Sequence, residues 1–198
     1  MACSSAGGTV CDHGIAEYYA RLREVLARLP LAEIERALAL LLDAYRRGKR
    51  VYFLGNGGSA ATAAHAANDF CKLTIAPGRP RVRALALTDN VPLLTAWAND
   101  SAYSDVFAEQ LENLLEPGDV VVAISGSGNS PNVLKAVEFA RARGAATIGW
   151  TGFQGGRLKD LVDVAIIVPS DSMAQIEDVH LTLNHALAEA LREAIRRM

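Results

Sequence analysis

Cysteine, net charge and long apolar stretches are all scarce in this 198-residue chain. Cys3, Cys11 and Cys71 lack the paired spacing of a zinc finger or a redox motif, so we expect reduced thiols in a cytoplasmic protein. The net charge of −2 gives no reason to expect nucleic acid or an anionic membrane as a partner. No apolar run approaches the length of a membrane span, and the first residues lack the basic-then-apolar pattern of a signal peptide.

What the chain does contain is enough apolar sequence for one well-buried domain. Apolar residues make up 51% of it and charged residues 21%, and the length favours a single α/β domain over residues 1–198. Residues 1–12 are expected to be flexible. Amphipathic patterns at 14–29 and 31–48, separated by Pro30, predict two N-terminal helices arranged as a hairpin.

Apolar runs alternate with helical patterns through the predicted α/β core at residues 49–198. The apolar runs are short and predict buried parallel strands at 51–54, 83–87, 120–124, 146–150 and 164–168. The helical patterns lie between and after them, at 59–73, 91–97, 103–115, 131–143, 155–161 and 173–197. This order predicts an α/β three-layer sandwich with a five-stranded parallel sheet, flavodoxin-like in kind, behind the N-terminal helical hairpin.

Two loops rich in glycine and serine follow the first and third of the predicted strands. They are Gly55–Ser59 and Ser125–Ser130. A buried strand, a glycine-rich turn and a helix start leave several backbone N–H groups pointing at one spot, which favours a phosphate. Neither loop carries the Walker or the G-x-G-x-x-G pattern, so we expect a sugar monophosphate and no nucleotide cofactor. Either loop taken alone could also be no more than a tight strand-to-helix turn.

Several motifs give the chain a resemblance to a known family. They are Gly-Asn-Gly-Gly-Ser-Ala-Ala at 55–61, Leu-Thr-Asp at 87–89, Thr-Ala-Trp-Ala-Asn-Asp at 95–100, Ile-Ser-Gly-Ser-Gly-Asn-Ser-Pro-Asn-Val-Leu at 124–134 and Val-Pro-Ser at 168–170. On these motifs the sequence resembles the SIS (sugar isomerase) domains, and among them the phosphoheptose isomerases, over roughly residues 45–195. The resemblance implies conversion of sedoheptulose 7-phosphate to the aldose D-glycero-heptose 7-phosphate through an enediol, for bacterial heptose and surface-glycan synthesis. It also implies a homotetramer with active sites between subunits.

The resemblance further implies a catalytic group drawn from two helices. The family's histidine, glutamate, glutamine and histidine align with His65, Asp69, Glu177 and His185, where they act as acid and base and, in some members, as zinc ligands. Aspartate is one methylene shorter than glutamate, while the new carboxylate of Glu177 can compensate and makes the site more negative. We interpret the chain as an active variant, with a lost or redirected activity as the alternative.

Each member of this group receives a role in the implied reaction. Asp69 or Glu177 is the proton-transferring base, and His185 is the acid at the carbonyl oxygen. His65 either holds the carboxylate in place or joins it around a metal. All four residues are candidate ligands of one zinc ion per subunit, although such residues also form ordinary hydrogen-bonded clusters.

The phosphate and the sugar hydroxyls are assigned to polar groups of the loops. Asn56 and Asp89 are expected to orient hydroxyls, although Asp89 could instead be only a helix cap. His180, on a neighbouring stripe of the last helix, is interpreted as a core residue. The phosphate is assigned to the hydroxyls and backbone N–H groups of Gly57, Gly58, Ser59, Ser125, Gly126, Ser127 and Ser130.

Two other functions stay open at this point. One is a non-catalytic SIS-domain adaptor or phosphosugar sensor, because one relative of these isomerases keeps the fold but binds the replication initiator protein. The combination of His65, Asp69 and His185 argues against it, since an adaptor has no need of such a set. The other is an isomerase of a pentose or hexose phosphate, because contacts at the far end of the sugar depend on loops and on a neighbouring subunit.

Overall fold

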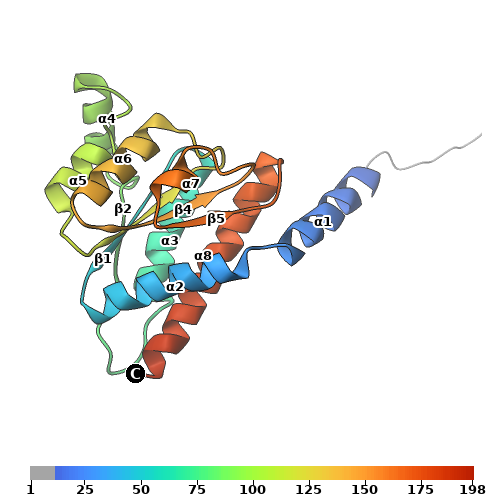
Figure 1. The fold of residues 1–198 in the computed structure, drawn as a ribbon, viewed down its shortest axis with the longest axis horizontal. Coiled ribbons are helices and arrows are strands. Elements are labelled where there is room, and N and C mark those ends of the chain that lie inside the picture. The colour runs from blue at the N-terminus through green and yellow to red at the C-terminus, as the bar shows by residue number, and fades with distance from the viewer. Residues whose placement is uncertain (1–11) are drawn as a thin grey trace, which may run out of the picture.

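The computed structural model describes residues 12–198, which form a five-stranded, all-parallel sheet between two layers of helices (Figure 1). The sheet has the order β2-β1-β3-β4-β5, which is the flavodoxin-like, doubly wound topology that the sequence predicts. The strands are β1 (Arg50–Gly55), β2 (Arg83–Ala86), β3 (Val120–Ile124), β4 (Ala146–Thr151) and β5 (Val164–Ile167).

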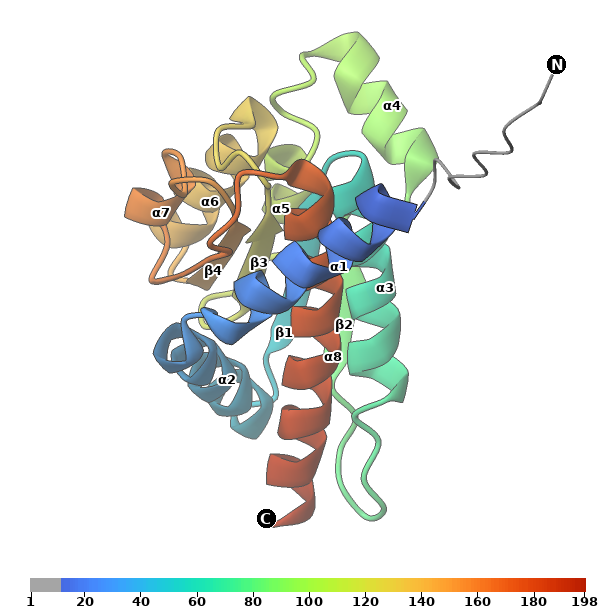
Figure 2. The same cartoon turned by 90° about the vertical axis from the view of Figure 1, so that its right-hand side faces the viewer.

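Helices bury both faces of this sheet. On β1, Val51 and Phe53 point into one core and Tyr52 and Leu54 into the other. Continuous apolar runs of this kind suit strands that lie between two helical layers. One layer consists of α2 (Leu31–Arg46), α3 (Gly58–Lys72) and α8 (Met173–Arg196), and the other of α5 (Ala108–Leu114), α6 (Pro131–Ala142) and α7 (Leu158–Leu161), with α4 (Val91–Asp100) at its edge (Figures 1 and 2).

The helix expected over 155–161 is shorter in the structure. Gly155 and Gly156 have φ angles of +84° and +55°, and α7 is confined to the four residues Leu158–Leu161. These left-handed conformations suit glycine and cannot continue a right-handed helix. The prediction is therefore wrong for the first half of this segment.

The helix expected from residue 103 begins only at Ala108. The preceding turn is organised by Asp105, whose carboxylate accepts hydrogen bonds from Lys135, at 2.7 Å, and from the hydroxyls of Ser101 and Ser104. The Lys135 contact and the two hydroxyls lower the pKa of Asp105 to about 2. Side chains that bond locally in this way compete with helix formation, which accounts for the late start of α5.

α1 (Asp12–Ala27) and α2 are both present on either side of Pro30, but they do not lie side by side (Figures 1 and 2). Val25 of α1 packs with Val168, Ile176 and Val179 near the start of α8. α1 therefore crosses the beginning of α8 and runs on beyond the sheet, at an angle to α2 (Figure 2). Within residues 12–198, no helix combines the length and apolar character that crossing a membrane requires.

Candidate active site

The two glycine- and serine-rich loops begin at the same level of the sheet, on neighbouring strands. Gly55 at the end of β1 is the register partner of Ile124 at the end of β3. The chain leaves β1 toward β2 on one side and leaves β3 toward β4 on the other. The space between the two loops is therefore the topological switch point, where sheets of this kind bind their ligands.

A cavity of about 270 Å³ opens between these loops. The first residues of α3 and the Ser130 that precedes α6 line it, so two helix N-termini contribute to one space. Ser130 occupies the N-cap position of α6, yet its hydroxyl makes no capping bond and lies 3.2 Å from the hydroxyl of Ser125. The residues around the cavity are Asn56, Gly57, Gly58, Ser59, Ile124, Ser125, Gly126, Ser127, Ser130, Met173 and Glu177.

The loop after β3 is braced by the loop after β4. Gly128 has a φ of +65°, and a Cβ atom built on it would lie 2.1 Å from the carbonyl oxygen of Gly155. In the opposite direction, a Cβ atom on Gly156 would lie 2.4 Å from the carbonyl oxygen of Ser127. The backbone N–H of Leu158 donates to the Gly128 carbonyl at 2.9 Å. Only glycine allows the two backbones to approach this closely.

A reciprocal pair of amides joins the two loops to each other. Asn56 and Asn132 each donate from Nδ2 to the other's Oδ1 at 2.8 Å, and the Tyr103 hydroxyl donates to Asn56 Oδ1 at 2.9 Å. The amide of Asn56, which the sequence assigns to sugar hydroxyls, is thus engaged within the protein. Asn132 and Tyr103 escaped the sequence analysis, and only the position of Asn132 within the Ser/Gly motif could have drawn attention to it.

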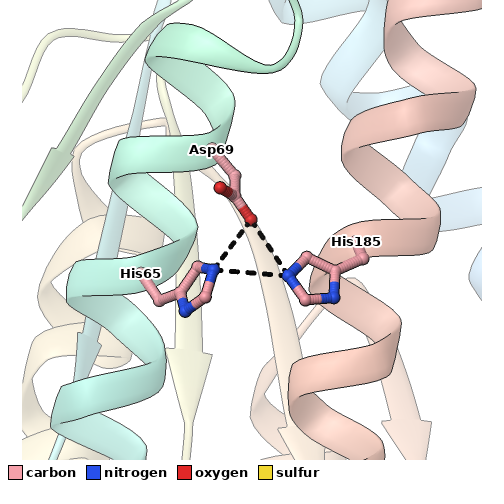
Figure 3. A group of neighbouring side chains, drawn as sticks. All are labelled: His65, Asp69 and His185. Carbon is pink, nitrogen blue, oxygen red and sulfur yellow. Dashed lines mark hydrogen bonds and ion pairs between the residues drawn. The ribbon is translucent and has the colours of Figure 1, made fainter.

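Two histidines and one carboxylate converge between α3 and α8 (Figure 3). Nε2 of His65 lies 3.2 Å from Oδ2 of Asp69, and Nε2 of His185 lies 3.4 Å from the same oxygen. The two Nε2 atoms are 3.3 Å apart. The histidine side chains are 44% and 49% exposed, whereas that of Asp69 is 12% exposed. The three side chains form a cluster that a substrate could reach from the histidine side.

The spacing of these three atoms fits a metal ion. A tetrahedral zinc with zinc–ligand distances of roughly 2.0–2.1 Å separates its ligands by about 3.3 Å. The edges of the triangle formed by His65 Nε2, Asp69 Oδ2 and His185 Nε2 are 3.2, 3.4 and 3.3 Å long. Two imidazoles and a carboxylate are also a donor set that zinc accepts.

Glu177 stands apart from this cluster, which comprises only His65, Asp69 and His185 among the described residues. Its carboxylate lies at the start of α3, where a Cβ atom on Gly58 would be 2.5 Å from Oε1. His65 follows Gly58 by seven residues on α3, and His185 follows Glu177 by eight on α8. At 1.5 Å of rise per residue, the histidines of the cluster are therefore roughly 10–12 Å along the two helices from Gly58 and Glu177, which line the cavity.

Two further sequence candidates take clear positions. Asn90, rather than Asp89, caps α4, because its Oδ1 accepts from the backbone N–H of Leu93 at 3.2 Å. Asp89 is exposed just after β2, at the loop edge of the sheet. His180 is buried in the core, as predicted, with Nε2 3.2 Å from the carbonyl oxygen of Thr151. Burial lowers the pKa of His180 to about 4, so the ring is neutral.

Sequence comparison agrees with the class of domain that this fold and these loops define. The family model described as "SIS domain" matches residues 17–152. A phosphoheptose isomerase from Chlorobaculum tepidum is 38% identical over 194 residues, which cover 96% of this chain and 93% of that protein. A phosphoheptose isomerase from Thiobacillus denitrificans is 45% identical over 161 residues, covering 80% and 81%.

A solved structure supports the same relationship. The phosphoheptose isomerase from Neisseria gonorrhoeae superposes with a TM-score of 0.84 at 32% identity, and the match covers 90% of this chain and 97% of that one. The chain therefore belongs to the SIS domain family and, within it, to the phosphoheptose isomerases.

Proposed function

We propose that this protein converts sedoheptulose 7-phosphate to D-glycero-heptose 7-phosphate, for bacterial heptose and surface-glycan synthesis. The observation that carries the proposal is the convergence of His65, Asp69 and His185 within 3.2–3.4 Å of one another, near a cavity made by two Ser/Gly loops. A phosphate-binding site alone would serve a sensor or an adaptor. The added cluster supplies proton-transfer groups, which an isomerase needs.

The phosphate of the substrate binds between the loops in this proposal. Ser59, Ser125, Ser127 and Ser130 offer hydroxyl donors, and the N-termini of α3 and α6 offer backbone N–H groups. From there the sugar extends along α3 and α8 toward the cluster, roughly 10–12 Å away. An extended seven-carbon chain with a terminal phosphate has a comparable length, which favours a heptose over a shorter sugar.

Proton transfer between C1 and C2 takes place at the cluster. Asp69 acts as the base, and His185 donates a proton to the carbonyl oxygen as the enediol forms. His65 shares Oδ2 of Asp69 with His185 and so holds both the carboxylate and the opposite imidazole in place. Glu177 lies at the phosphate end and contacts hydroxyls there, together with Asp89 and the second N–H of the Asn56 amide, whose first N–H is donated to Asn132. The alternative assignment makes Glu177 the base, and the Glu177 variant described below tests it.

A zinc ion would be held by His65, Asp69 and His185. It would polarise the carbonyl and stabilise charge on the enediol oxygens. Because Nε2 of His185 would then be a metal ligand and carry no proton, the ion would take over the task of the acid at the carbonyl oxygen, whereas His185 is the acid in the metal-free protein.

We also propose a homotetramer in which a neighbouring subunit completes the site. The exposed histidines leave one side of the cluster open to a second chain. α1 projects from the body and exposes Ile15, Tyr19 and Leu26, which are 63%, 65% and 40% exposed and lie on one side of the helix. Analytical ultracentrifugation of the purified protein should give four times the 21.1 kDa chain mass, and a monomer would contradict the proposal.

The deciding experiment is incubation with sedoheptulose 7-phosphate in deuterated water, followed by NMR, with and without a chelator. We expect aldose formation with deuterium at C2, and loss of turnover with the chelator, restored by zinc. Turnover that survives chelation would show that the reaction needs no metal, and the proposed isomerase activity would stand. No conversion of this substrate, with tight binding of it, would replace the isomerase by a phosphosugar sensor.

A further inference from the structure

Asn184 makes a buried contact with the carboxylate of the cluster. It lies on α8, directly before His185, and is completely buried. Its Nδ2 donates a hydrogen bond of 2.7 Å to Oδ2 of Asp69. This is the same oxygen that faces Nε2 of His65 and Nε2 of His185, at 3.2 and 3.4 Å. One oxygen atom is thus held from three directions.

The chemistry of the amide fixes its orientation. Oδ1 of Asn184 has no hydrogen-bond partner among the described residues, although it is buried. Rotating the amide by half a turn would bring this oxygen against the carboxylate, so that two acceptors would face each other. The donor must therefore point at Asp69. A buried acceptor without a partner lowers stability, so the position is not explained by stability alone.

A second amide offers a contrast. Asn68 donates to the other oxygen of Asp69, Oδ1, at 3.2 Å, but Asn68 is exposed. Water can replace an exposed donor at little cost, whereas nothing can replace a donor in a fully buried position. The two asparagines thus form a natural pair in which only one has a contact that solvent cannot supply.

We propose that Asn184 is a positioning residue that fixes Oδ2 of Asp69 between the two histidines. Asp69 is on α3 and Asn184 on α8, so the bond also ties the two helices that carry the cluster. Without it, the Asp69 carboxylate could rotate about its Cβ–Cγ bond and turn Oδ2 away from the imidazoles. Hydrogen bonds of this kind to a metal-binding carboxylate typically change metal affinity or activity by 10- to 100-fold.

The catalytic consequence rests on the proposed function, and the test compares Asn184→Leu with Asn68→Ala. Zinc affinity is measured by competition with a chromophoric chelator, and kcat and KM with the sugar phosphate. For Asn184→Leu we expect zinc affinity and kcat to fall by about 10- to 100-fold, with KM within about threefold because the phosphate loops are remote. Asn68→Ala should change zinc affinity and kcat by less than about threefold.

A third readout separates this inference from the proposed function. In a crystal structure of metal-free Asn184→Leu, the Asp69 carboxylate should leave its place between the two imidazoles, whether or not the wild type binds zinc or turns over. An unmoved carboxylate would overturn the inference, as would zinc affinity and kcat within threefold of wild type where the wild type has both. If the leucine variant does not fold, Asn184→Ala is judged by the same three criteria.

Discussion

At the scale of single residues, the position of Glu177 sets the charge of the phosphate end of the site. Its carboxylate lies against Gly58, at the first turn of α3. The backbone N–H groups at a helix N-terminus favour a negative charge, and the carboxylate satisfies that preference before any ligand arrives. In the proposed binding mode the phosphate takes the same place. The two anions would then compete, and the side chain of Glu177 would swing from the N-terminus of α3 to the neighbouring sugar hydroxyls when the phosphate binds.

Replacing Glu177 by glutamine tests both this competition and the assignment of the base. We expect Glu177→Gln to lower the KM for the sugar phosphate by about three- to tenfold, because a like charge beside the phosphate is removed. We expect kcat to stay within about threefold. Steady-state kinetics measure kcat and KM of this variant, and Glu189→Gln, at an exposed position on the same helix, is the control. A fall in kcat of a hundredfold or more would instead make Glu177 the base.

Neutralising Asp69 should affect kcat rather than binding, which is the opposite of the effect expected for Glu177→Gln. In Asp69→Asn the volume is nearly unchanged, but the negative charge and the base are lost, because the amide oxygen that remains is only a neutral hydrogen-bond acceptor. We expect kcat to fall by about a hundredfold or more, with phosphate-analogue affinity within about threefold, measured by calorimetry. His185→Gln should behave alike through loss of the acid. Turnover near the wild-type rate in either variant would rule out the cluster as the catalytic centre.

At the scale of the elements, the site depends on the close approach of two loop backbones. Gly128→Ala would place a Cβ atom 2.1 Å from the Gly155 carbonyl oxygen at a φ of +65°, so backbone must move. Gly48→Ala meets the same left-handed strain at +67° but has open space around it. We expect about 1–2 kcal/mol of destabilisation for Gly48→Ala and at least about 2 kcal/mol more for Gly128→Ala, by urea denaturation. Equal losses would mean that the loops are not tightly joined.

The elements also show how far the sequence could predict this fold. β1, β3 and β4 were predictable because their apolar runs are buried on both faces, and β3 coincides with its prediction at 120–124. The edge strand β2 was predictable from its position in the alternating pattern, although Arg83 and Leu85 are exposed. The starts of α5 and α7 were not predictable, because they depend on the bonds of Asp105 and on the packing of Gly155 and Gly156. The bond of Asp105 to Lys135 and the packing of Gly155 and Gly156 join segments far apart in the chain, and the local bonds of Asp105 to Ser101 and Ser104 leave no periodicity in the sequence.

The candidate site also contains some features that the sequence could predict and others that it could not. His65 and Asp69 could be paired from the sequence, since residues four apart share a helix face. Their contact with His185, and the separation of Glu177 from the cluster, depend on how α8 packs against α3. The sequence does contain one indication of Asn184, because an amide stands there within the buried stripe of α8. Its partner is 115 residues away in sequence, which is why only the structure identifies it.

At the scale of the whole molecule, the buried His180 makes stability depend on pH. Its pKa is about 4 in the folded protein and 6.5 unperturbed, so the unfolded chain binds the extra proton first as the pH falls. The contribution of the neutral His180 ring to the free energy of unfolding is complete above pH 6.5 and is lost between pH 6.5 and 4. The shift corresponds to up to about 3 kcal/mol.

Urea denaturation of the metal-free protein at several pH values between 7 and 4 measures this loss. Because the protein carries many other titratable groups, the informative quantity is the difference between wild type and His180→Leu. We expect the free energy of unfolding of wild type to fall more steeply than that of the variant across this window. Parallel curves would show that His180 is not the group responsible.

The cavity between the loops that follow β1 and β3, where we propose that the phosphate binds, affects how long the protein persists in a cell. Its two loops lie about 70 residues apart in sequence and meet only after the sheet has assembled, so no partly folded segment can retain the ligand. Sugar phosphate at about a hundred times its Kd would therefore add about 2.7 kcal/mol against global unfolding. The concentration of the sugar phosphate would then govern how quickly proteases remove the protein, and enzyme abundance would follow that concentration without any change in gene expression.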